Sequence, residues 1–217
     1  MDAMLPHVHH ALTVAVDFAE WQRRFADVQG FLFDLEGYTL LQLAAHGEGD
    51  GAIVEIGSFM GRSTAFLAAG SASTRREKVY AVDHFKGSPE HQPGQSYADP
   101  VLAAEGSTYR VFEENLKRLG LRDQVVPIRS TSAKAARNWR GPIRLLFIDG
   151  DHDYASVKRD YGAWSPFIVP GGYICFHDVE LWPGVTRFFN ELIESTPTLR
   201  VAFTAWSLKV VEKGHSS

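Results

Sequence analysis

Residues 143–178 read IRLLFIDGDHDYASVKRDYGAWSPFIVPGGYICFHD, and this stretch decides the fold. The runs IRLLFID (143–149) and GGYICFHD (171–178) are short, apolar and typical of buried strands. Residues 153–169 predict a helix between them, because apolar side chains recur every three or four residues. That stripe consists of Tyr154, Val157, Tyr161, Trp164 and Ile168. A strand, a helix and a strand in this order predict two parallel strands joined by a crossover helix.

The same alternation continues on both sides of this stretch. Further strands are predicted at 52–57, 78–83 and 124–129, and further helices at 61–70, 109–120, 131–139 and 183–195. Two final strands, 200–204 and 206–212, have almost no connection between them, so they must pair antiparallel. The predicted fold class is α/β: a Rossmann-like open sheet, mostly parallel, with an antiparallel C-terminal edge strand and helices on both faces.

The first 46 residues have a different pattern. Apolar residues at helical spacing predict a helix, and a second apolar stretch reaches His46. The first stripe consists of Val14, Phe18, Trp21, Phe25 and Val28. The polar break GEGDG follows at 47–51. We therefore expect an N-terminal helical cap at 1–46 and a ligand-binding sheet domain at 47–217.

The composition restricts the classes of function. The 217 residues include 22 basic and 26 acidic side chains, so the net charge of −4 provides no basic field for nucleic acid or a membrane surface. A single cysteine, Cys175, excludes an internal disulfide framework. No apolar run approaches the ~18 residues of a membrane span, and the N-terminus lacks a secretory signal pattern. We expect a cytoplasmic protein without nucleic-acid or membrane partners.

Glycines follow the first predicted strand of the sheet domain. Gly57 and Gly61 allow a tight turn and a close backbone approach to a ligand, and the next helix begins there with free N–H groups. The second strand ends at Asp83, where a carboxylate can accept hydrogen bonds from both ribose hydroxyls of a nucleoside. Each feature alone is also compatible with an ordinary connection. Together, they predict a nucleoside cofactor.

Acid and imidazole groups follow the fourth and fifth strands. Asp149 and His152 come after the fourth strand, and His177 and Asp178 end the fifth. Neighbouring strands lie ~4.8 Å apart, so Asp149 and Asp178 could share a hard cation. His152 would stand over the same place as a general base. A structural role is the alternative for any one of these residues, and the clustering carries the prediction.

A long connection, residues 84–108, follows Asp83 and contains six Gly or Pro residues. Connections of this length are typical of functional lids or of disordered segments. As a lid, it would cover the cofactor and contribute substrate contacts. The candidate contacts are His84, Phe85, Lys86, Glu90 and His91.

Four motifs resemble a known family. They are VEIGSFMGRST (54–64), YAVD (80–83), LLFIDGDHDYASVKRDYGAW (145–164) and PGGYICFHDV (170–179). They are similar to the class I S-adenosylmethionine-dependent methyltransferases. The nearest branch is the small-molecule O-methyltransferases, with macrocin O-methyltransferase and the cephalosporin hydroxylase-like proteins. The resemblance implies that residues 47–217 bind S-adenosylmethionine and that the partner is a small-molecule hydroxyl acceptor.

The resemblance also implies roles for individual residues in cofactor binding. Lining the methionine and ribose part would be Glu55, Gly57, Ser58 and Gly61, with Ser63 nearby. Asp83 would hold the ribose hydroxyls, His84 or Phe85 would lie near the adenine, and Ser130 or Ser132 would approach its edge.

Further roles concern the metal and the chemistry. Asp149 matches a first metal ligand that also borders the cofactor, Asp178 matches a later ligand, and His152 stands where sugar O-methyltransferases carry their base. His177 replaces an acid of metal-using relatives, which either shifts preference from Mg²⁺ towards softer ions such as Mn²⁺ or Zn²⁺ or means that His177 is not a ligand. The resemblance therefore leaves open whether a metal is required. Related folds form dimers through N-terminal helices, so a homodimer is predicted.

Three other functions compete with this prediction. An NAD-dependent oxidoreductase would use the same sheet, but Asp83 lies 26 residues after Gly57 instead of ~20, and GSFMGR lacks the second glycine of the dinucleotide motif. A Ser/His/Asp hydrolase would need a GxSxG elbow, which is absent from the sequence. A non-catalytic nucleoside-binding module of the same fold remains open, and so does an N-methyl acceptor.

Overall fold

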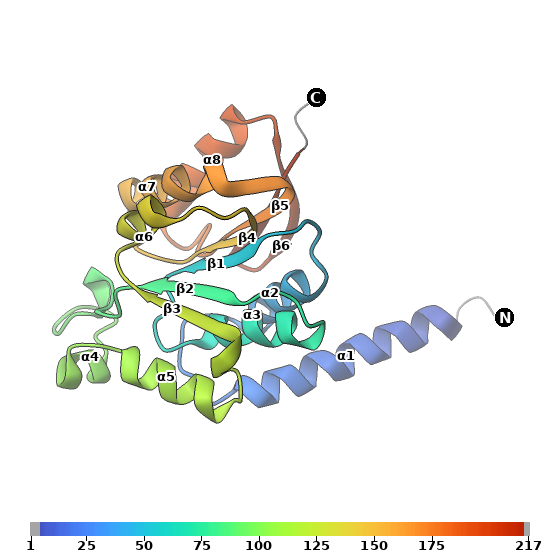
Figure 1. Cartoon of the computed structure of the whole chain (residues 1–217), viewed down its shortest axis with the longest axis horizontal. Helices are drawn as coiled ribbons and strands as arrows, with labels where there is room; N and C mark the ends of the chain where they lie inside the picture. Colours follow the sequence, from blue (N-terminus) through green and yellow to red (C-terminus); the bar gives the residue numbers. More distant parts are fainter. Residues whose placement is uncertain (1–4, 215–217) are drawn as a thin grey trace.

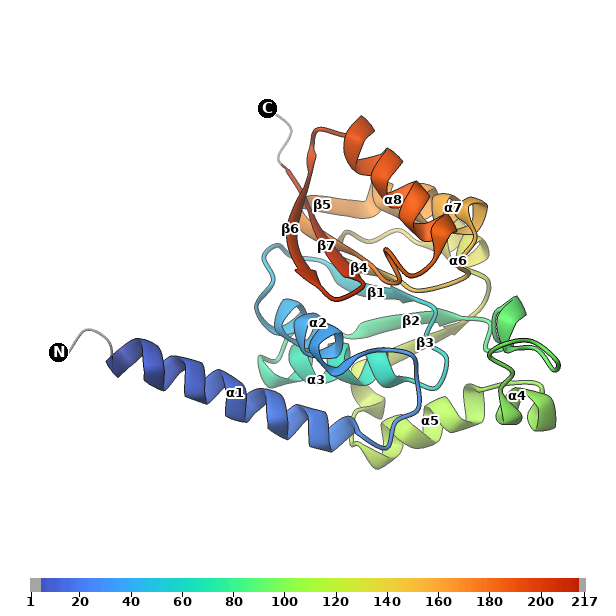
Figure 2. The same cartoon turned by 180° about the vertical axis from the view of Figure 1, so that it is seen from behind.

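The structure is a computed structural model that describes residues 5–214, with side chains described from residue 14 onwards. A seven-stranded sheet lies between two layers of helices (Figures 1 and 2). The strands follow the order β3-β2-β1-β4-β5-β7-β6. Residues 1–4, at the start of the predicted N-terminal cap, lie outside the described part of the chain.

The first five strands are parallel, as their short apolar runs predict. They are β1 (Ala52–Ile56), β2 (Val79–Asp83), β3 (Val125–Arg129), β4 (Ile143–Ile148) and β5 (Ile168–Phe176). The last two strands, β6 (Leu199–Ala205) and β7 (Leu208–Lys213), pair antiparallel, and β7 also pairs antiparallel with β5. The predicted fold class is confirmed. Within it, β7 lies between β5 and β6, so β6 is the edge strand.

Each face of the sheet is covered by its own helices (Figure 1). On one face lie α2 (Asp34–His46), α3 (Arg62–Ser73) and α5 (Tyr109–Arg118). On the other face lie α6 (Ser132–Asn138), α7 (Tyr154–Trp164) and α8 (Pro183–Ser195). The strands are apolar on both faces because both are buried.

Helices α2 and α3 approach each other closely through glycines. A Cβ at Gly37 would lie 2.4 Å from the Phe66 ring, and one at Gly70 would lie 2.1 Å from the carbonyl oxygen of Leu41. Any larger residue would force the helices apart. This contact fixes the N-terminal segment to the sheet domain.

Helix α1 (Leu5–Phe25) projects from the rest of the molecule (Figures 1 and 2). Phe25 is fully buried, but Val14 is 40% exposed, so the predicted apolar stripe is buried only towards its end. Val28 is buried but follows the helix rather than belonging to it. The predicted helical face therefore holds from Val14 to Phe25 and was wrong at Val28.

Two connections differ from the sequence-based expectation. Residues 84–108 contain a 3-10 turn, Pro89–His91, and a short helix, α4 (Pro100–Glu105), which Asp99 caps through the N–H groups of Val101 and Leu102. The helix predicted at 153–169 ends at Trp164, followed by a 3-10 turn, and Ile168 already belongs to β5. Another 3-10 turn, Arg122–Gln124, precedes β3.

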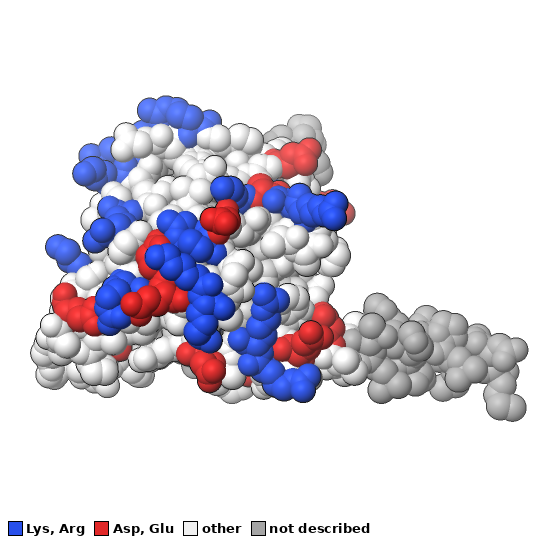
Figure 3. All heavy atoms as spheres, turned by 60° about the horizontal axis from the view of Figure 1, so that its bottom comes forward, with Lys and Arg blue, Asp and Glu red and all other residues white. Residues whose placement is uncertain are grey.

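The surface carries mixed charge where it can be seen around α5. Figure 3 shows basic and acidic side chains side by side across this face. Arg110 pairs with Glu105 and Glu114, and Arg122 pairs with Glu113. Among the described helices, none is long and apolar enough to cross a membrane.

Candidate functional site

A cavity of about 950 Å³ opens at the carboxyl ends of β1, β2, β4 and β5. This is where open α/β sheets place ligands, because strand order reverses between β1 and β4. Residues 29–33 and parts of 84–97 form further walls. Predicted site residues that line the cavity are Gly57, Ser58, Ser63, Asp83, His84, Ser130, Ser132, Asp149, His152 and Asp178.

The glycine turn after β1 brings two strand ends into contact. Gly57 has φ +86°, and a Cβ there would lie 1.9 Å from the carbonyl oxygen of Asp149. Only glycine allows this approach. Gly61, at φ +92°, begins α3 but packs against Phe112 rather than lining the cavity, so its role is to shape the turn.

Asp83 holds the glycine turn from the end of β2. One carboxylate oxygen accepts hydrogen bonds from the N–H groups of Ser58 and Phe59, at 2.9 and 2.8 Å, and the other accepts from Phe85. A carboxylate offers about four acceptor positions, so Asp83 can still bind hydroxyl groups from the cavity. Asp83 is therefore placed both to hold the glycine turn and to bind hydroxyl groups of a ligand.

Glu55 lies beneath the cavity rather than on its wall, which corrects the predicted contact with the cofactor. It is fully buried, and its Oε2 accepts hydrogen bonds from Ser58 and Thr64 at 2.7 and 2.5 Å. Its Oε1 has no hydrogen-bond partner among the described residues. Burial raises the pKa of Glu55 to about 7 despite these hydrogen bonds.

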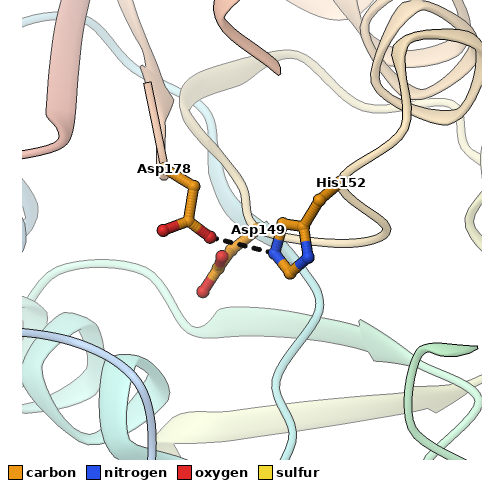
Figure 4. A group of neighbouring side chains, drawn as sticks. All are labelled: Asp149, His152 and Asp178. Atoms are coloured by element: carbon orange, nitrogen blue, oxygen red, sulfur yellow. Dashed lines mark ion pairs between the residues drawn. The ribbon is translucent and has the colours of Figure 1, made fainter. Parts of the chain in front are cut away.

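Asp149, His152 and Asp178 point towards one another at the cavity wall (Figure 4). Each offers a ligand atom within 4.8 Å of the others, which is a grouping able to hold a metal ion. Asp178 adopts φ +63°, a conformation that costs energy for a non-glycine residue and is common at functional sites. The structure thus brings together three of the four predicted residues from β4 and β5.

His152 is held on several sides. Its Nε2 lies 2.9 Å from Asp178 and its Nδ1 lies 2.6 Å from Glu90, and its ring stacks on Trp182 with centroids 4.5 Å apart. Burial opposes protonation, but the hydrogen bond to Asp178 and the charges of Asp149 and Glu90 raise the pKa of His152 above its ordinary value. The imidazole is therefore oriented by carboxylates on both sides.

His177 lies behind this group rather than in it. Its Nδ1 is 2.9 Å from Asp149, and its Nε2 is 3.0 Å from Glu36 on α2. Both ring nitrogens are engaged, so the arrangement does not support the predicted role of His177 as a metal ligand. Burial opposes its protonation, but the charge of Asp149 and the hydrogen bonds that the ring donates to the surrounding carboxylates raise the pKa of His177 well above its usual value.

Glu36 was not predicted from the sequence. It is fully buried, and besides His177 it accepts hydrogen bonds from the backbone and hydroxyl of Ser207, at 3.0 and 2.6 Å. It thereby joins α2, the end of β5 and the β6–β7 turn. A charged residue among the apolar positions of 35–45 was the only sequence signal.

The opposite end of the cavity offers polar groups from β3 and α7. The Ser130 hydroxyl is buried and has no partner among the described residues, whereas the Ser132 hydroxyl accepts a hydrogen bond from Trp164. Asp160 also lines this end. Phe85, predicted near an adenine, is instead fully buried in the core against Tyr109 and Phe112.

The lid segment contributes unevenly. His84, Glu90 and His91 line the cavity, and Lys86 does not. Aromatic wall residues from separate segments escaped the sequence analysis. They are Phe31, Phe59, Tyr97 and Trp182.

This fold and site define a Rossmann-like methyltransferase architecture. Similar solved structures are the O-methyltransferase NovP (TM-score 0.68, 16% identity, 84% of this chain and 81% of that one) and the calicheamicin methyltransferase CalS11 (0.62, 20%, 84% and 79%). A methyltransferase from Podospora anserina bound to S-adenosylhomocysteine is also similar (0.61, 17%, 99% and 97%). At these identities, the likeness establishes the fold.

The sequence comparison identifies the family of the chain. A family profile described as "Methyltransferase domain" matches residues 54–179, more than half of the chain. The chain belongs to this methyltransferase family, which confirms the class predicted from the motifs and disfavours the dehydrogenase and hydrolase alternatives.

Two curated relatives are uncharacterized proteins. One, from Sinorhizobium fredii, is 29% identical over 70% of this chain and 16% of its own length; the other, from Acanthamoeba polyphaga mimivirus, is 27% identical over 76% and 69%. The chain thus spans only a small part of the first relative.

Proposed function

We propose that the chain is an S-adenosylmethionine-dependent O-methyltransferase acting on a hydroxyl group of a small molecule. The observation that carries the proposal is the shared cavity. The glycine turn and Asp83 border it on one side, and the carboxylate-flanked His152 borders it on the other. A nucleoside-bearing donor and a proton acceptor for the attacked hydroxyl therefore face the same space.

The residues present fit the cofactor. Asp83 retains acceptor capacity for ribose hydroxyls, and the buried Ser130 hydroxyl has no partner in the described part of the chain, at the end where an adenine edge would lie. When bound, the sulfonium cofactor supplies a methyl group that is already activated. The chain's own residues then need to align the acceptor and remove its proton. Alignment of two reactants contributes roughly 7–11 kcal/mol to lowering a barrier.

His152 is the proposed base. A general base contributes about 10²–10⁴-fold in rate. Glu90 and Asp178 orient the ring, and their charges stabilise its protonated form after proton transfer. A cation bound in the same cavity would lower the raised pKa of His152 again, which favours the neutral ring that can accept a proton.

A metal-assisted variant uses the same three side chains. Asp149, His152 and Asp178 offer two carboxylates and one imidazole, a set that suits Mn²⁺ or Mg²⁺. In this second candidate, His152 would be a ligand rather than a base, and the cation would lower the pKa of the acceptor hydroxyl. Turnover that is abolished by chelation and restored by Mn²⁺ would favour it over the metal-free mechanism.

Two further proposals concern the domain organisation and the oligomeric state. Residues 29–33 form a wall of the cavity, which supports the role of residues 1–46 as a cap. The homodimer rests on analogy with related folds, and sedimentation equilibrium measures it. The compartment stays a prediction from the sequence.

Transfer of labelled methyl from S-adenosylmethionine to a panel of hydroxylated compounds tests the proposed function. His152→Ala should lower kcat by about 10²–10⁴-fold and leave the Kd for S-adenosylhomocysteine nearly unchanged, because the ring faces the acceptor. His46→Ala is the matched control, since His46 is exposed at the end of α2 and does not line the cavity. Unchanged turnover in His152→Ala would reject this residue as the base. Failure of the wild-type protein to bind the cofactor would reject the function.

A further inference from the structure

We propose that the methyl acceptor is an uncharged aromatic compound, and that nucleotide-linked sugars and coenzyme A esters are excluded. The inference rests on the proposed function and narrows its substrate class. Two observations of the cavity carry it: a continuous aromatic wall leading to His152, and an excess of carboxylates over lysine and arginine side chains in the described lining.

The aromatic wall is built from four separate segments of the chain. The ring of His91 stacks on Phe59 and on Phe31, with centroids 5.3 and 5.2 Å away, and these two phenylalanine rings lie 5.7 Å from each other. Phe31 meets Tyr97 edge-on at 5.9 Å, and Tyr97 lies 6.1 Å from Trp182. Trp182 in turn stacks on His152 at 4.5 Å. All six rings line the cavity, so the wall ends at the proposed base.

Much of this wall is exposed. Phe31 is 54% exposed, Tyr97 is 49% exposed, and the neighbouring lining residue Leu181 is 51% exposed. Large apolar side chains grouped around a cavity mark a binding surface rather than a chance arrangement. A flat ring placed against them gains apolar burial and offset or edge-on aromatic contacts. A bare sugar would gain less from this wall.

The charge of the cavity selects against anions. Six carboxylates line it: Asp83, Glu90, Asp149, Asp151, Asp160 and Asp178. Only two lysine or arginine side chains, Arg62 and Arg159, are among the described residues of the lining.

One of the two, Arg62, is not available to an anionic group. The guanidinium of Arg62 donates to the backbone carbonyls of Phe25, Val28 and Leu32 and pairs with Asp34.

Arg159 on α7 is exposed and donates to the Ser156 hydroxyl, so it is the one lysine or arginine of the described lining that remains against six carboxylates. His91 does not replace them, because burial lowers its pKa and so disfavours the charged ring. A diphosphate or a multiply charged coenzyme A would therefore meet six carboxylates with a single arginine to compensate them, which is costly in a partly buried site.

Matched acceptors test the inference. The methyl ester, the free acid and the coenzyme A thioester of 3,4-dihydroxycinnamate present the same hydroxylated ring with increasing negative charge. Phenyl rhamnoside and TDP-rhamnose form a second pair for sugar hydroxyls. We expect kcat/KM to be at least ~10-fold higher for each neutral compound, and the ratio to shrink as added salt screens the carboxylates. A thioester or nucleotide sugar that reacts as well as its neutral partner would overturn the proposal.

A charge introduced at the rim sharpens the test. Leu181→Arg places a cation on the wall and should raise kcat/KM for the thioester several-fold while the neutral ester gains nothing. Val201→Arg is the matched control, because Val201 is 39% exposed on β6 and does not line the cavity. An equal effect of both variants, or no effect of Leu181→Arg on the ratio, would contradict the proposal.

Binding separates this inference from the function on which it rests. If S-adenosylhomocysteine does not stabilise the protein against heat, both the proposed function and the inference about the acceptor are rejected. If it does and no compound is methylated, thermal shifts of the loaded protein decide: added stabilisation by the neutral ester alone supports the aromatic acceptor. Equal stabilisation by ester and thioester refutes it while leaving methyl transfer intact.

Discussion

Arg144 and Glu55 are both fully buried charged residues, on the neighbouring strands β4 and β1, but at opposite ends of the sheet. Arg144 lies at the amino end. Its guanidinium donates to the carbonyls of Leu43 and Ala44 at the end of α2 and pairs with Glu77. Cationic groups stabilise helix C-termini, so this charge fastens α2 to the sheet.

Glu55 lies at the carboxyl end, beneath the cavity. Two hydroxyls donate to one of its oxygens, and the other oxygen has no partner among the described residues. The difference shows that burial of charge does not by itself mark a functional site. A buried charge whose hydrogen bonds are complete holds the fold together, whereas an incompletely bonded one beneath a cavity is typical of a binding site.

Removing the fully hydrogen-bonded Arg144 side chain should have the largest effect on stability. Arg144→Ala leaves the α2 carbonyls and Glu77 without their partner, and we expect a loss of about 3–5 kcal/mol in the free energy of unfolding. Denaturant titration measures it. The matched control Arg200→Ala, which removes a 73% exposed side chain paired with Glu212, should cost less than about 1 kcal/mol. Similar losses in the two variants would break the comparison.

The protonation of Glu55 should be visible in the pH dependence of the free energy of unfolding. Its folded pKa of about 7 exceeds the reference value of 4.5, so the folded protein keeps a proton that the unfolded chain releases between these values. Stability is therefore present below pH 4.5 and is lost as pH rises to about 7, by roughly 3 kcal/mol. Glu55→Gln removes this contribution, so the variant should gain that amount relative to wild type across the window. Parallel pH profiles of stability would contradict the assigned pKa.

The smallest expected effect concerns cofactor affinity. Asp83→Asn loses acceptor capacity towards the turn and towards ribose hydroxyls, so we expect the Kd for S-adenosylhomocysteine to rise about 10-fold, or ~1.4 kcal/mol. Calorimetric titration measures this. Asp123→Asn, at an exposed position outside the cavity lining, serves as the control. An unaltered Kd in Asp83→Asn would place the ribose elsewhere.

The sheet could be predicted because each strand is a short apolar run that can be recognised in the sequence. The alternation of these runs with helices then predicts parallel strands. The polar residues after each run then follow from geometry, since parallel strands end at one edge. This is why Asp83, Asp149, His152 and Asp178 were found. Helix α4 was missed although Asp99 followed by Pro100 is a helix-start signal.

The rest of the site depends on contacts between distant segments. Glu36 meets His177 across 141 residues, and no local pattern indicates such a pair. Phe85 adopts a φ of +60° at the start of the lid segment and packs in the core against Tyr109 and Phe112, which are more than 20 residues away in the sequence. The aromatic wall likewise forms only when the lid segment, the N-terminal cap and the residues before α8 pack together.

The central claim is that one cavity holds the cofactor against the glycine turn and presents its methyl group beside His152. A crystal structure of the complex with S-adenosylhomocysteine tests it most directly. We predict that the ribose hydroxyls lie within hydrogen-bonding distance of Asp83, about 3 Å, and that the sulfur faces the space between Asp149 and His152. A ligand bound outside the cavity, or one whose sulfur points away from His152, would contradict the account.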